Sequence, residues 1–336
     1  MRSPIVRVVP FQPHCFAFGG FELQMIAAME SARAAGANIA PLDFWKREAD
    51  FDVLHLWGLD LQHNQTVKWA RSGGKKTVLS TLVEYSGKSW LRHLVSSAVG
   101  PARLRQAMLA SVDCLTAVNE AQARYLVDLG VPGNKVRVVP NIVEDIFFRI
   151  RGSKGTGAFG IENYVLCTGN VCQRKNQLSL VSACRKLGVP LLLVGNILTG
   201  EDDYGRAVAE AMAALDGSRW IKGLSPGSVE LAEAYCGAAV FALPSHSEQQ
   251  PISALEAAAC GKPIVLADRT YASQEFYESA ALADPDSADS IAGALRMAFD
   301  QPDAHCPPLS AIAQCRREKV GAAYMAIYER LVSGAW

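Results

Sequence analysis

The chain has 336 residues, half of them hydrophobic, and its 33 basic and 33 acidic side chains give a formal charge of zero. A single hydrophobic core rarely supports this length, so we expect two domains. The neutral charge excludes nucleic acid as an expected partner, because nucleic-acid-binding domains carry an excess of Lys and Arg.

The nine cysteines are scattered and show no paired metal spacing, which favours a reducing cytoplasm and no metal site. The first residues lack the long apolar stretch of a secretory signal. No window approaches the roughly 18 apolar residues of a membrane-spanning helix. We therefore expect a cytoplasmic protein that can touch a membrane only at its surface.

Short β-branched runs alternate with longer helical patterns, which is typical of βαβ units and a parallel sheet, so we expect an α/β fold. Helical patterns at 21–35 and 120–129 end at Gly36 and Gly130, which suit a left-handed C-cap. The strands predicted in the first half are Ile5–Val9, Val53–Trp57, Thr77–Ser80, Cys114–Val118 and Val136–Val139.

The sequence becomes irregular between Asn141 and Asn163, and residues 151–157 have the composition of a linker. We place the boundary there, giving an N-terminal domain of residues 1–148 and a C-terminal domain of residues 149–315. An amphipathic pattern over 316–331 has no strand after it, so we expect 316–336 to pack back on the first domain. The strands predicted in the second half are Tyr164–Thr168, Leu191–Val194, Val240–Leu243 and Ile264–Ala267.

Two glutamates, Glu248 and Glu256, bracket a segment that lies between the last two predicted strands. Pro251 suits the first turn of a helix, and Gly261 ends it. In an open parallel sheet, ligands bind in the loops after the strands, and the next helix turns its unpaired amides toward them. Glu248 should lie in that loop and Glu256 early on the helix, so both are candidate ligand groups.

A glycine turn at Gly169 and Asn170 follows the first strand of the second block and leads to Arg174 and Lys175. We place these two cations near a helix N-terminus, where they oppose the helix dipole. An anion such as a diphosphate would explain them. The alternative is a pair of solvated surface charges. Lys175 is the preferred candidate.

Three weaker features complete the candidate site. Gly19 and Gly20 follow the first strand, where glycine lets the backbone approach a ligand closely, although any tight turn uses glycine. His55 ends a strand among apolar neighbours and is either a ligand contact or, as we favour, a hydrogen-bonded core residue. His246 precedes Glu248 by two residues and either contacts the ligand or shapes the loop.

An ordered set of motifs runs through the second half: Gly169 with Lys175-Asn176, Val194-Gly195, residues 222–225, Tyr235, Pro244-Ser245, Glu248 with Leu255-Glu256-Ala257, and Gly261-Lys262-Pro263. This set resembles the donor domain of the family 4 retaining glycosyltransferases, which have the GT-B fold of two Rossmann-like domains facing across a cleft. The first half resembles the family more loosely, through Gly19-Gly20, residues 52–55 and Val139-Pro140-Asn141.

The resemblance implies a donor site in the second domain. In it, Glu256 accepts hydrogen bonds from the ribose, Glu248 lies beside the donor sugar and Lys175 binds the diphosphate. Amides around Ile252 and Ser253 bind the sugar and the diphosphate, and Gly19 and Gly20 face the same phosphates. The donor is then a UDP- or GDP-sugar and the acceptor a hydroxyl of a cell-surface glycan or glycolipid. Fixed cations and amides replace a metal, and no cofactor is expected.

Two departures from the family pattern affect the site. Asn170 stands where the family commonly has arginine, so Arg174 is a candidate to supply that charge. A histidine that many members carry after the strand at 77–80 is replaced here by a stretch containing Glu84. Glu84 is either an acceptor contact or a solvated loop carboxylate.

Between Tyr85 and Val112 the sequence has no acidic residue, and basic residues alternate with apolar ones. Such a stretch can rest on anionic lipid, so residues 85–112 are a candidate membrane contact. The alternative is an ordinary pair of helices with an apolar side in the core.

Three other functions stay open. The chain can be a GT-B epimerase, a phosphorylase, or a catalytically silent subunit that binds a nucleotide sugar. A dinucleotide-dependent dehydrogenase is disfavoured, because Gly19-Gly20 is not followed by the full glycine fingerprint.

Overall fold

The computed structural model describes residues 2–16, 19–60, 63–81, 100–152, 155 and 157–335, with only the backbone of 100–103. The chain divides into two compact units, one of Met1–Ile142 with Gln314–Trp336 and one of Val143–Ala313. The division corrects the predicted boundary at 148. Helix α6 (Asp145–Arg149) belongs to the second unit, because Phe147 packs edge-on against Tyr235, with ring centroids 5.3 Å apart.

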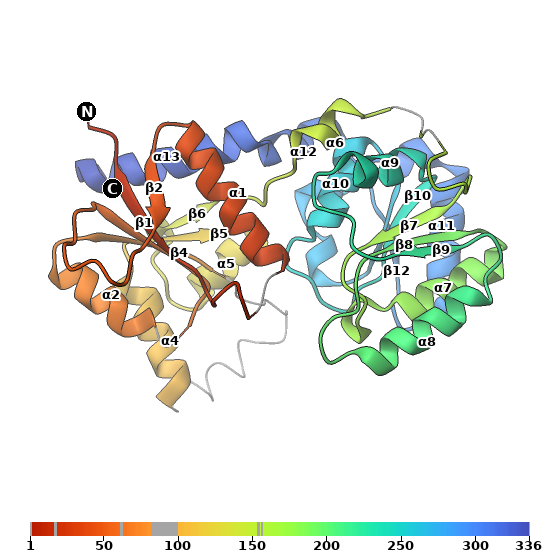
Figure 1. Cartoon of the computed structure of the whole chain (residues 1–336), viewed down its shortest axis with the longest axis horizontal. Helices are drawn as coiled ribbons and strands as arrows, with labels where there is room; N and C mark the ends of the chain where they lie inside the picture. Colours follow the sequence, from red (N-terminus) through yellow and green to blue (C-terminus); the bar gives the residue numbers. More distant parts are fainter. Residues whose placement is uncertain are drawn as a thin grey trace. The chain divides into compact units, whose positions relative to one another are not determined.

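The first unit contains a parallel six-stranded sheet in the order β2-β1-β3-β4-β5-β6 (Figure 1). Its strands are β1 (Ile5–Val9), β2 (Asn38–Pro41), β3 (Val53–Trp57), β4 (Lys76–Ser80), β5 (Cys114–Ala117) and β6 (Val136–Val138). The prediction missed β2, a four-residue edge strand that ends in proline and is half exposed. Edge strands with little apolar content give a weak sequence signal.

Helices cover both faces of this sheet. Alternate strand residues face opposite layers: Val53 packs toward one core cluster, and Leu54 and Leu56 pack toward the other. The helices of the unit are α1 (Gly20–Ala34), α2 (His63–Ser72), α4 (Gly100–Ser111), α5 (Glu120–Asp128) and α13 (Arg317–Ser333), with a 3-10 turn at Gly133–Lys135. None of the helices in the described part of the chain combines the length and apolar character needed to cross a bilayer.

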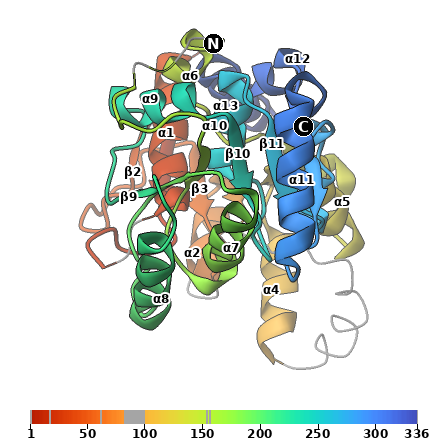
Figure 2. The ribbon, with the colours of Figure 1, turned by 90° about the vertical axis from the view of Figure 1, so that its right-hand side faces the viewer.

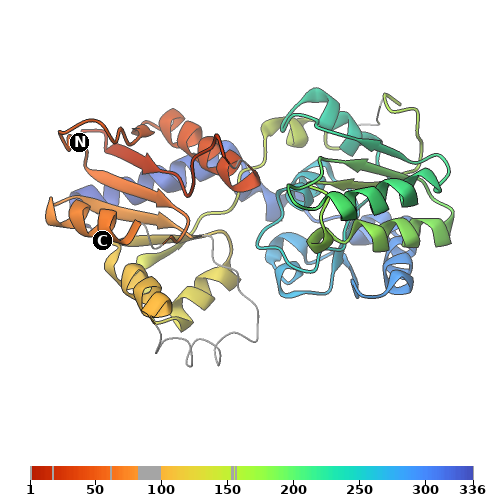
Figure 3. The ribbon, with the colours of Figure 1, turned by 60° about the horizontal axis from the view of Figure 1, so that its bottom comes forward.

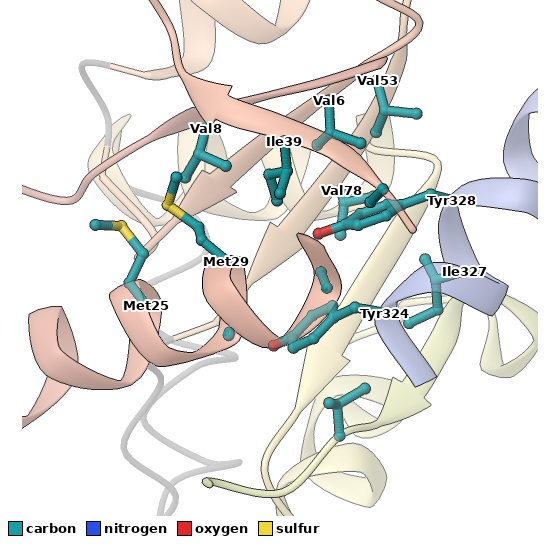
Figure 4. Packing of buried hydrophobic residues seen from close by; sticks show 14 of the residues in the cluster. Val6, Val8, Met25, Met29, Ile39, Val53, Val78, Tyr324, Ile327 and Tyr328 are labelled. Atoms are coloured by element: carbon teal, nitrogen blue, oxygen red, sulfur yellow. The ribbon is translucent and has the colours of Figure 1, made fainter. Parts of the chain in front are cut away.

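The C-terminal helix α13 lies beside α1 on one face of the first sheet (Figure 3). Tyr324, Ile327 and Tyr328 of α13 share a core cluster with Met25 and Met29 of α1 and with valines of the strands (Figure 4). Because its apolar side is buried in this cluster, α13 is part of the first unit although it follows the second unit in the chain.

His55 of β3 ties α13 to the sheet. Its Nδ1 lies 2.8 Å from the Tyr328 hydroxyl and its Nε2 lies 2.8 Å from Ser80 Oγ. Burial lowers the pKa of His55 to about 3, so the ring is neutral and each nitrogen has a partner. Of the two alternatives for His55, the structure shows the hydrogen-bonded core residue, and its predicted contact with substrate is corrected.

Gly321 allows the close approach of α13 to α1, which gives a prediction about stability. A Cβ added at Gly321 would lie 2.3 Å from the Ser31 carbonyl oxygen. We expect Gly321→Ala to lower the free energy of unfolding by about 1–3 kcal/mol, because the helices must separate. The control is Gly293→Ala on an exposed helical turn, where a Cβ meets nothing within 4 Å. It should stabilise by roughly 0.5–1 kcal/mol, and equal effects in urea unfolding would contradict the packing argument.

The second unit contains a parallel six-stranded sheet in the order β12-β11-β10-β7-β8-β9. Its strands are β7 (Val165–Thr168), β8 (Leu191–Val194), β9 (Arg219–Ile221), β10 (Val240–Leu243), β11 (Ile264–Ala267) and β12 (Ala281–Ala283). The four central strands are fully buried and were predicted. The three-residue strands β9 and β12 lie at the two edges of the sheet. They were not predicted, because short, partly exposed segments lack a clear sequence pattern.

Helices of the second unit pack against its sheet. Helix α7 contacts both α8 and α11, and the three lie side by side (Figure 2). Helix α10 contacts α9, β10 and β11. The remaining bounds are α7 (Gln177–Leu187), α8 (Asp202–Ala213), α9 (Val229–Gly237), α10 (Ile252–Cys260), α11 (Ala288–Asp300) and α12 (Leu309–Ile312), with 3-10 turns at Gln173–Lys175, Thr270–Ala272, Glu275–Tyr277, Pro302–His305 and Ala313–Cys315.

Candidate functional site

Strands β7 and β10 are neighbours in the second sheet, and their chain connections leave in opposite directions, to β8 and to β11. The loops after such a pair diverge, and a crevice between them is the usual ligand site of an open α/β sheet. The loop after β7 carries Arg174 and Lys175, and the loop after β10 carries His246 and Glu248. The strand order therefore brings together residues that are more than 70 positions apart.

One carboxylate oxygen joins the two loops. Glu248 Oε1 lies 3.1 Å from Lys175 Nζ and 2.8 Å from Arg174 Nη1. Burial by itself would raise the pKa of Glu248, but Lys175 and Arg174 lower it, so the carboxylate stays ionised. Lys175 and Glu248 are mostly buried, whereas the Arg174 side chain is 47% exposed. Two cations share one anion, which leaves a net positive charge.

Arg174 and Lys175 lie just before the N-terminus of α7, as predicted. They form a 3-10 turn, Gln173–Lys175, and α7 begins at Gln177. Their counter-charge in this structure is Glu248. Asn176 separates turn and helix in a left-handed conformation, with φ of 60°. Its Nδ2 donates to the carbonyls of Pro244 and Pro285, at 3.3 and 2.7 Å, which fixes the turn to neighbouring loops.

Gly169 makes room for the lysine. Its φ is +128°, and a Cβ there would lie 3.0 Å from Lys175 Nζ. The loop at Gly195 approaches even more closely, since a Cβ on Gly195 would lie 2.0 Å from the Gly169 carbonyl oxygen. A side chain at either position would displace the backbone or the ammonium. Asn170 is exposed, and its carbonyl accepts a 3.0 Å hydrogen bond from Gln177.

Glu256 lies one turn into α10, on the side of the helix that faces Tyr235. The Tyr235 hydroxyl donates a 2.7 Å hydrogen bond to Glu256 Oε2. Burial raises the pKa of Glu256 to about 7, and the hydrogen bond from Tyr235 opposes that rise. Ile252 and Ser253 begin the helix and are half-buried, and the first turn contains no acidic residue. Amides at such a helix start are a suitable anion site, and Ile252 follows Glu248 by only four residues in the chain.

Of the other residues predicted for the site, His246, Gly19 and Gly20 lie in described parts of the chain. His246 is exposed, with Nδ1 3.7 Å from an Asp286 carboxylate oxygen. Gly19 and Gly20 begin α1, and the Gly19 amide already donates a 2.9 Å hydrogen bond to Glu22 Oε2. Glu84 lies outside the described residues, as does most of the predicted membrane contact at 85–112.

The site prediction gave no role to three polar residues that hold the site together: Thr168, Asn176 and Tyr235, although the last two belong to the motif set. Each is buried, and each makes a hydrogen bond within the loops described above. A polar residue at the end of an apolar strand, as at Thr168, was the available signal. Within the described ranges, no three His, Cys, Asp or Glu side chains are grouped so as to hold a metal ion.

Both units match known families in sequence. Residues 162–301 match the family model described as glycosyl transferases group 1, and residues 4–142 match the glycosyl transferase 4-like domain. Together these matches cover most of the chain. The chain belongs to the group 1 glycosyltransferases. This assignment confirms the resemblance inferred from the motifs between Gly169 and Pro263.

A curated relative of this glycosyltransferase chain is D-inositol 3-phosphate glycosyltransferase from Acidothermus cellulolyticus. The two are 30% identical over 177 residues, which are 48% of this chain and 39% of that protein. The match thus spans well under half of the relative.

Solved structures resemble the glycosyltransferase chain over its whole length. Sucrose-phosphate synthase from Thermosynechococcus elongatus superposes with a TM-score of 0.72 at 16% identity, covering 100% of both chains. HepE from Anabaena in complex with UDP-glucose gives a TM-score of 0.67 at 14% identity, covering 98% and 99% of the two chains. At these identities the likeness concerns the fold, and it confirms the predicted two-domain α/β fold of the GT-B class.

Proposed function

We propose that the chain is a retaining, metal-independent glycosyltransferase. It moves a sugar from a nucleotide-diphosphate donor to a hydroxyl of a cell-surface glycan or glycolipid. The observation that carries this proposal is the arrangement after β7 and β10, where Lys175 and Arg174 lie against Glu248. A buried site with net positive charge, next to free amides of α10, suits a diphosphate leaving group.

The donor is proposed to be a UDP-sugar, with a GDP-sugar as the second candidate. The solved structures of HepE contain UDP and UDP-glucose, which supports a uridine nucleotide in this fold. In this chain the ribose hydroxyls would donate to Glu256, and the sugar would lie beside Glu248. Both glutamates then orient the donor and transfer no proton.

The reaction follows from these positions. The bond between the anomeric carbon and the diphosphate oxygen breaks, and its electron pair stays on the diphosphate. Lys175, Arg174 and the α10 amides stabilise that charge, which is the part a metal ion plays in other enzymes. The acceptor oxygen bonds to the anomeric carbon on the face that the diphosphate leaves. The acceptor proton passes to the departing phosphate oxygen, so no protein nucleophile is required.

The test combines binding and turnover with the whole chain. A thermal-shift screen against UDP-, GDP- and ADP-sugars should identify the donor, because ligand binding to the folded state raises the Tm. With that donor and a glycan or glycolipid acceptor, we expect transfer with retained anomeric configuration, unchanged by EDTA. Binding without turnover would indicate a silent subunit. Conversion of the donor without an acceptor would indicate an epimerase, and a requirement for free phosphate a phosphorylase.

Replacing Glu248 with glutamine should have opposite effects on diphosphate binding and on turnover. In Glu248→Gln the cations lose their charged partner, so we expect a free nucleoside diphosphate to bind several-fold more tightly while kcat falls. Calorimetric titration gives the affinity, and steady-state kinetics with the intact donor give kcat. A variant in which affinity and kcat fall together would show that Glu248 contributes equally to binding of diphosphate and sugar, and would contradict this division of roles.

For the acceptor, we propose contact with an anionic membrane through α2 and α4, which lie against each other in the first unit. Helix α2 has no acidic residue and exposes Lys68 and Trp69, and α4 exposes Leu104 and Arg105. An indole ring beside basic side chains is a typical membrane-interface pattern.

Vesicle co-sedimentation tests this contact. We expect the chain to sediment with vesicles that contain phosphatidylglycerol, and not with phosphatidylcholine alone. Trp69→Ala should lose sedimentation. The matched control is Trp45→Ala, because Trp45 is 93% exposed in the same unit but lies between β2 and β3. Equal binding by wild type and Trp69→Ala would place the membrane contact elsewhere or exclude it.

A further inference from the structure

The hydroxyl of Tyr235 is a buried junction between three elements of the second unit. It lies 2.7 Å from Glu256 Oε2 on α10, 2.8 Å from Thr168 Oγ1 at the end of β7, and 3.2 Å from the Ser253 carbonyl oxygen. Tyr235 itself has no exposed surface. The junction therefore links the strand that leads to Gly169 and Lys175 with the helix that carries Glu256.

The Tyr235 hydroxyl carries one proton, so it can donate only one hydrogen bond at this junction. When the Tyr235 hydroxyl donates to the carboxylate, the Thr168 hydroxyl is the group that can donate to the phenol oxygen. Glu256 Oε2 is then held in place, and among the described residues no hydrogen bond reaches the other oxygen, Oε1. A carboxylate with one occupied and one available oxygen is oriented for an incoming pair of hydroxyl donors.

We propose that Tyr235 is a positioning residue of the nucleotide site, which fixes Glu256 through Oε2 and so presents Oε1 to the two ribose hydroxyls of the donor. This inference rests on the proposed function, because it assumes that Glu256 binds the ribose. Tyr235 touches no reacting atom, and its effect is transmitted through Glu256.

The junction also sets the pH range in which the donor binds. Burial raises the pKa of Glu256 to about 7, Tyr235 lowers it by donating to the charged form, and the nearby Glu144 raises it. Cys260, on the same helix, is the other titratable group that interacts with this carboxyl. Ribose hydroxyls bind the ionised form best, so affinity should fall as the pH drops below about 7. Removing the Tyr235 hydroxyl raises that midpoint further.

The experiment measures the Kd of the donor sugar found in the thermal-shift screen, between pH 5.5 and 9, by calorimetry. A nucleotide sugar is suitable because its diphosphate is a diester and does not titrate in this range. We expect Tyr235→Phe to bind about fivefold more weakly at pH 7 and to recover affinity at high pH, since a midpoint shifted upward by about one unit lowers the ionised fraction at pH 7 from about one half to about one eleventh. Glu256→Gln should bind weakly at every pH, without a midpoint.

Tyr164→Phe is the matched control. Tyr164 is buried in the same unit, and its hydroxyl donates a 2.6 Å hydrogen bond to the Ala234 carbonyl on α9. It should lower the Tm as Tyr235→Phe does, but leave Kd and its pH midpoint unchanged. If Tyr235→Phe lowers only the Tm, its role is structural and the proposal is wrong. If wild type binds no nucleotide sugar, the proposed function itself fails. If wild type binds with no pH midpoint, only this inference fails.

Discussion

Replacing Lys175 with alanine should lower kcat by about 100- to 1,000-fold, the usual effect of removing one group that stabilises charge in the transition state. Lys175 Nζ is mostly buried, and it lies between Gly169 and Glu248, where its charge is little screened by solvent. The diphosphate gains charge as the sugar bond breaks, so the loss should appear in kcat more than in the Kd of the donor. Single-turnover rates at saturating donor measure it directly.

The matched control for this variant is Lys186→Ala. Lys186 is an exposed lysine of α7 in the same unit, and its ion pair with Asp289 is at the surface. It should keep full activity, since exposed ion pairs contribute little. The Tm of Lys175→Ala should also be recorded, because the variant leaves Glu248 with Arg174 alone. Full turnover by a folded Lys175→Ala chain would show that the diphosphate binds elsewhere.

Replacing Glu256 with alanine should raise the Kd of the donor by about 10- to 100-fold, because hydrogen bonds to a charged group are lost. In the proposed site the carboxylate recognises the ribose and takes no part in the bond that breaks, so kcat at saturating donor should change much less. Calorimetry with the donor sugar and steady-state kinetics separate the two effects. A large fall in kcat with unchanged Kd would contradict the ribose assignment.

The Glu256 carboxyl should lower the free energy of unfolding at the pH at which it is ionised, which is the form proposed to bind the donor. Its pKa rises from an ordinary 4.5 to about 7 in the folded chain, mainly through burial. Folding therefore favours the protonated form, and the stability that this provides is present below pH 4.5 and is lost as the pH rises through about 7. Glu256→Gln should then match or exceed the wild-type Tm at pH 8 while binding donor weakly. This opposition of function and stability is common at binding sites.

Some parts of the prediction needed only local patterns. The strands β1, β3, β7, β8, β10 and β11 were predicted because each is a short apolar run with flanking turn residues. Helix α10 was predicted from Pro251 and Gly261, and Gly261 does end it in the left-handed conformation, with φ of +72°. Each of these features depends on the conformational preferences of a few adjacent residues, which a sequence displays directly.

Other parts depended on contacts between distant segments. Lys175 and Glu248 are 73 positions apart, and they meet because β7 and β10 are neighbours in the sheet. The apolar residues on either side of His55 in the sequence are compatible with a ligand contact and with a core residue. Its hydrogen bonds with Tyr328 of α13 and Ser80 of β4 show that it is a core residue. Burial decides charge in the same way, since the pKa of Glu256 depends on the helix and strand packed around it.

The motif order around Gly169, Glu248 and Glu256 was therefore enough to predict a GT-B glycosyltransferase fold, and the donor site that we propose rests on the same residues. The tertiary structure alone decided that Arg174 and Lys175 share Glu248 as their counter-charge, that Tyr235 holds Glu256, and that α13 belongs to the first unit. The physical reason is that motifs record local backbone requirements, whereas ion pairs, buried hydrogen bonds and pKa values depend on which strands and helices lie next to one another.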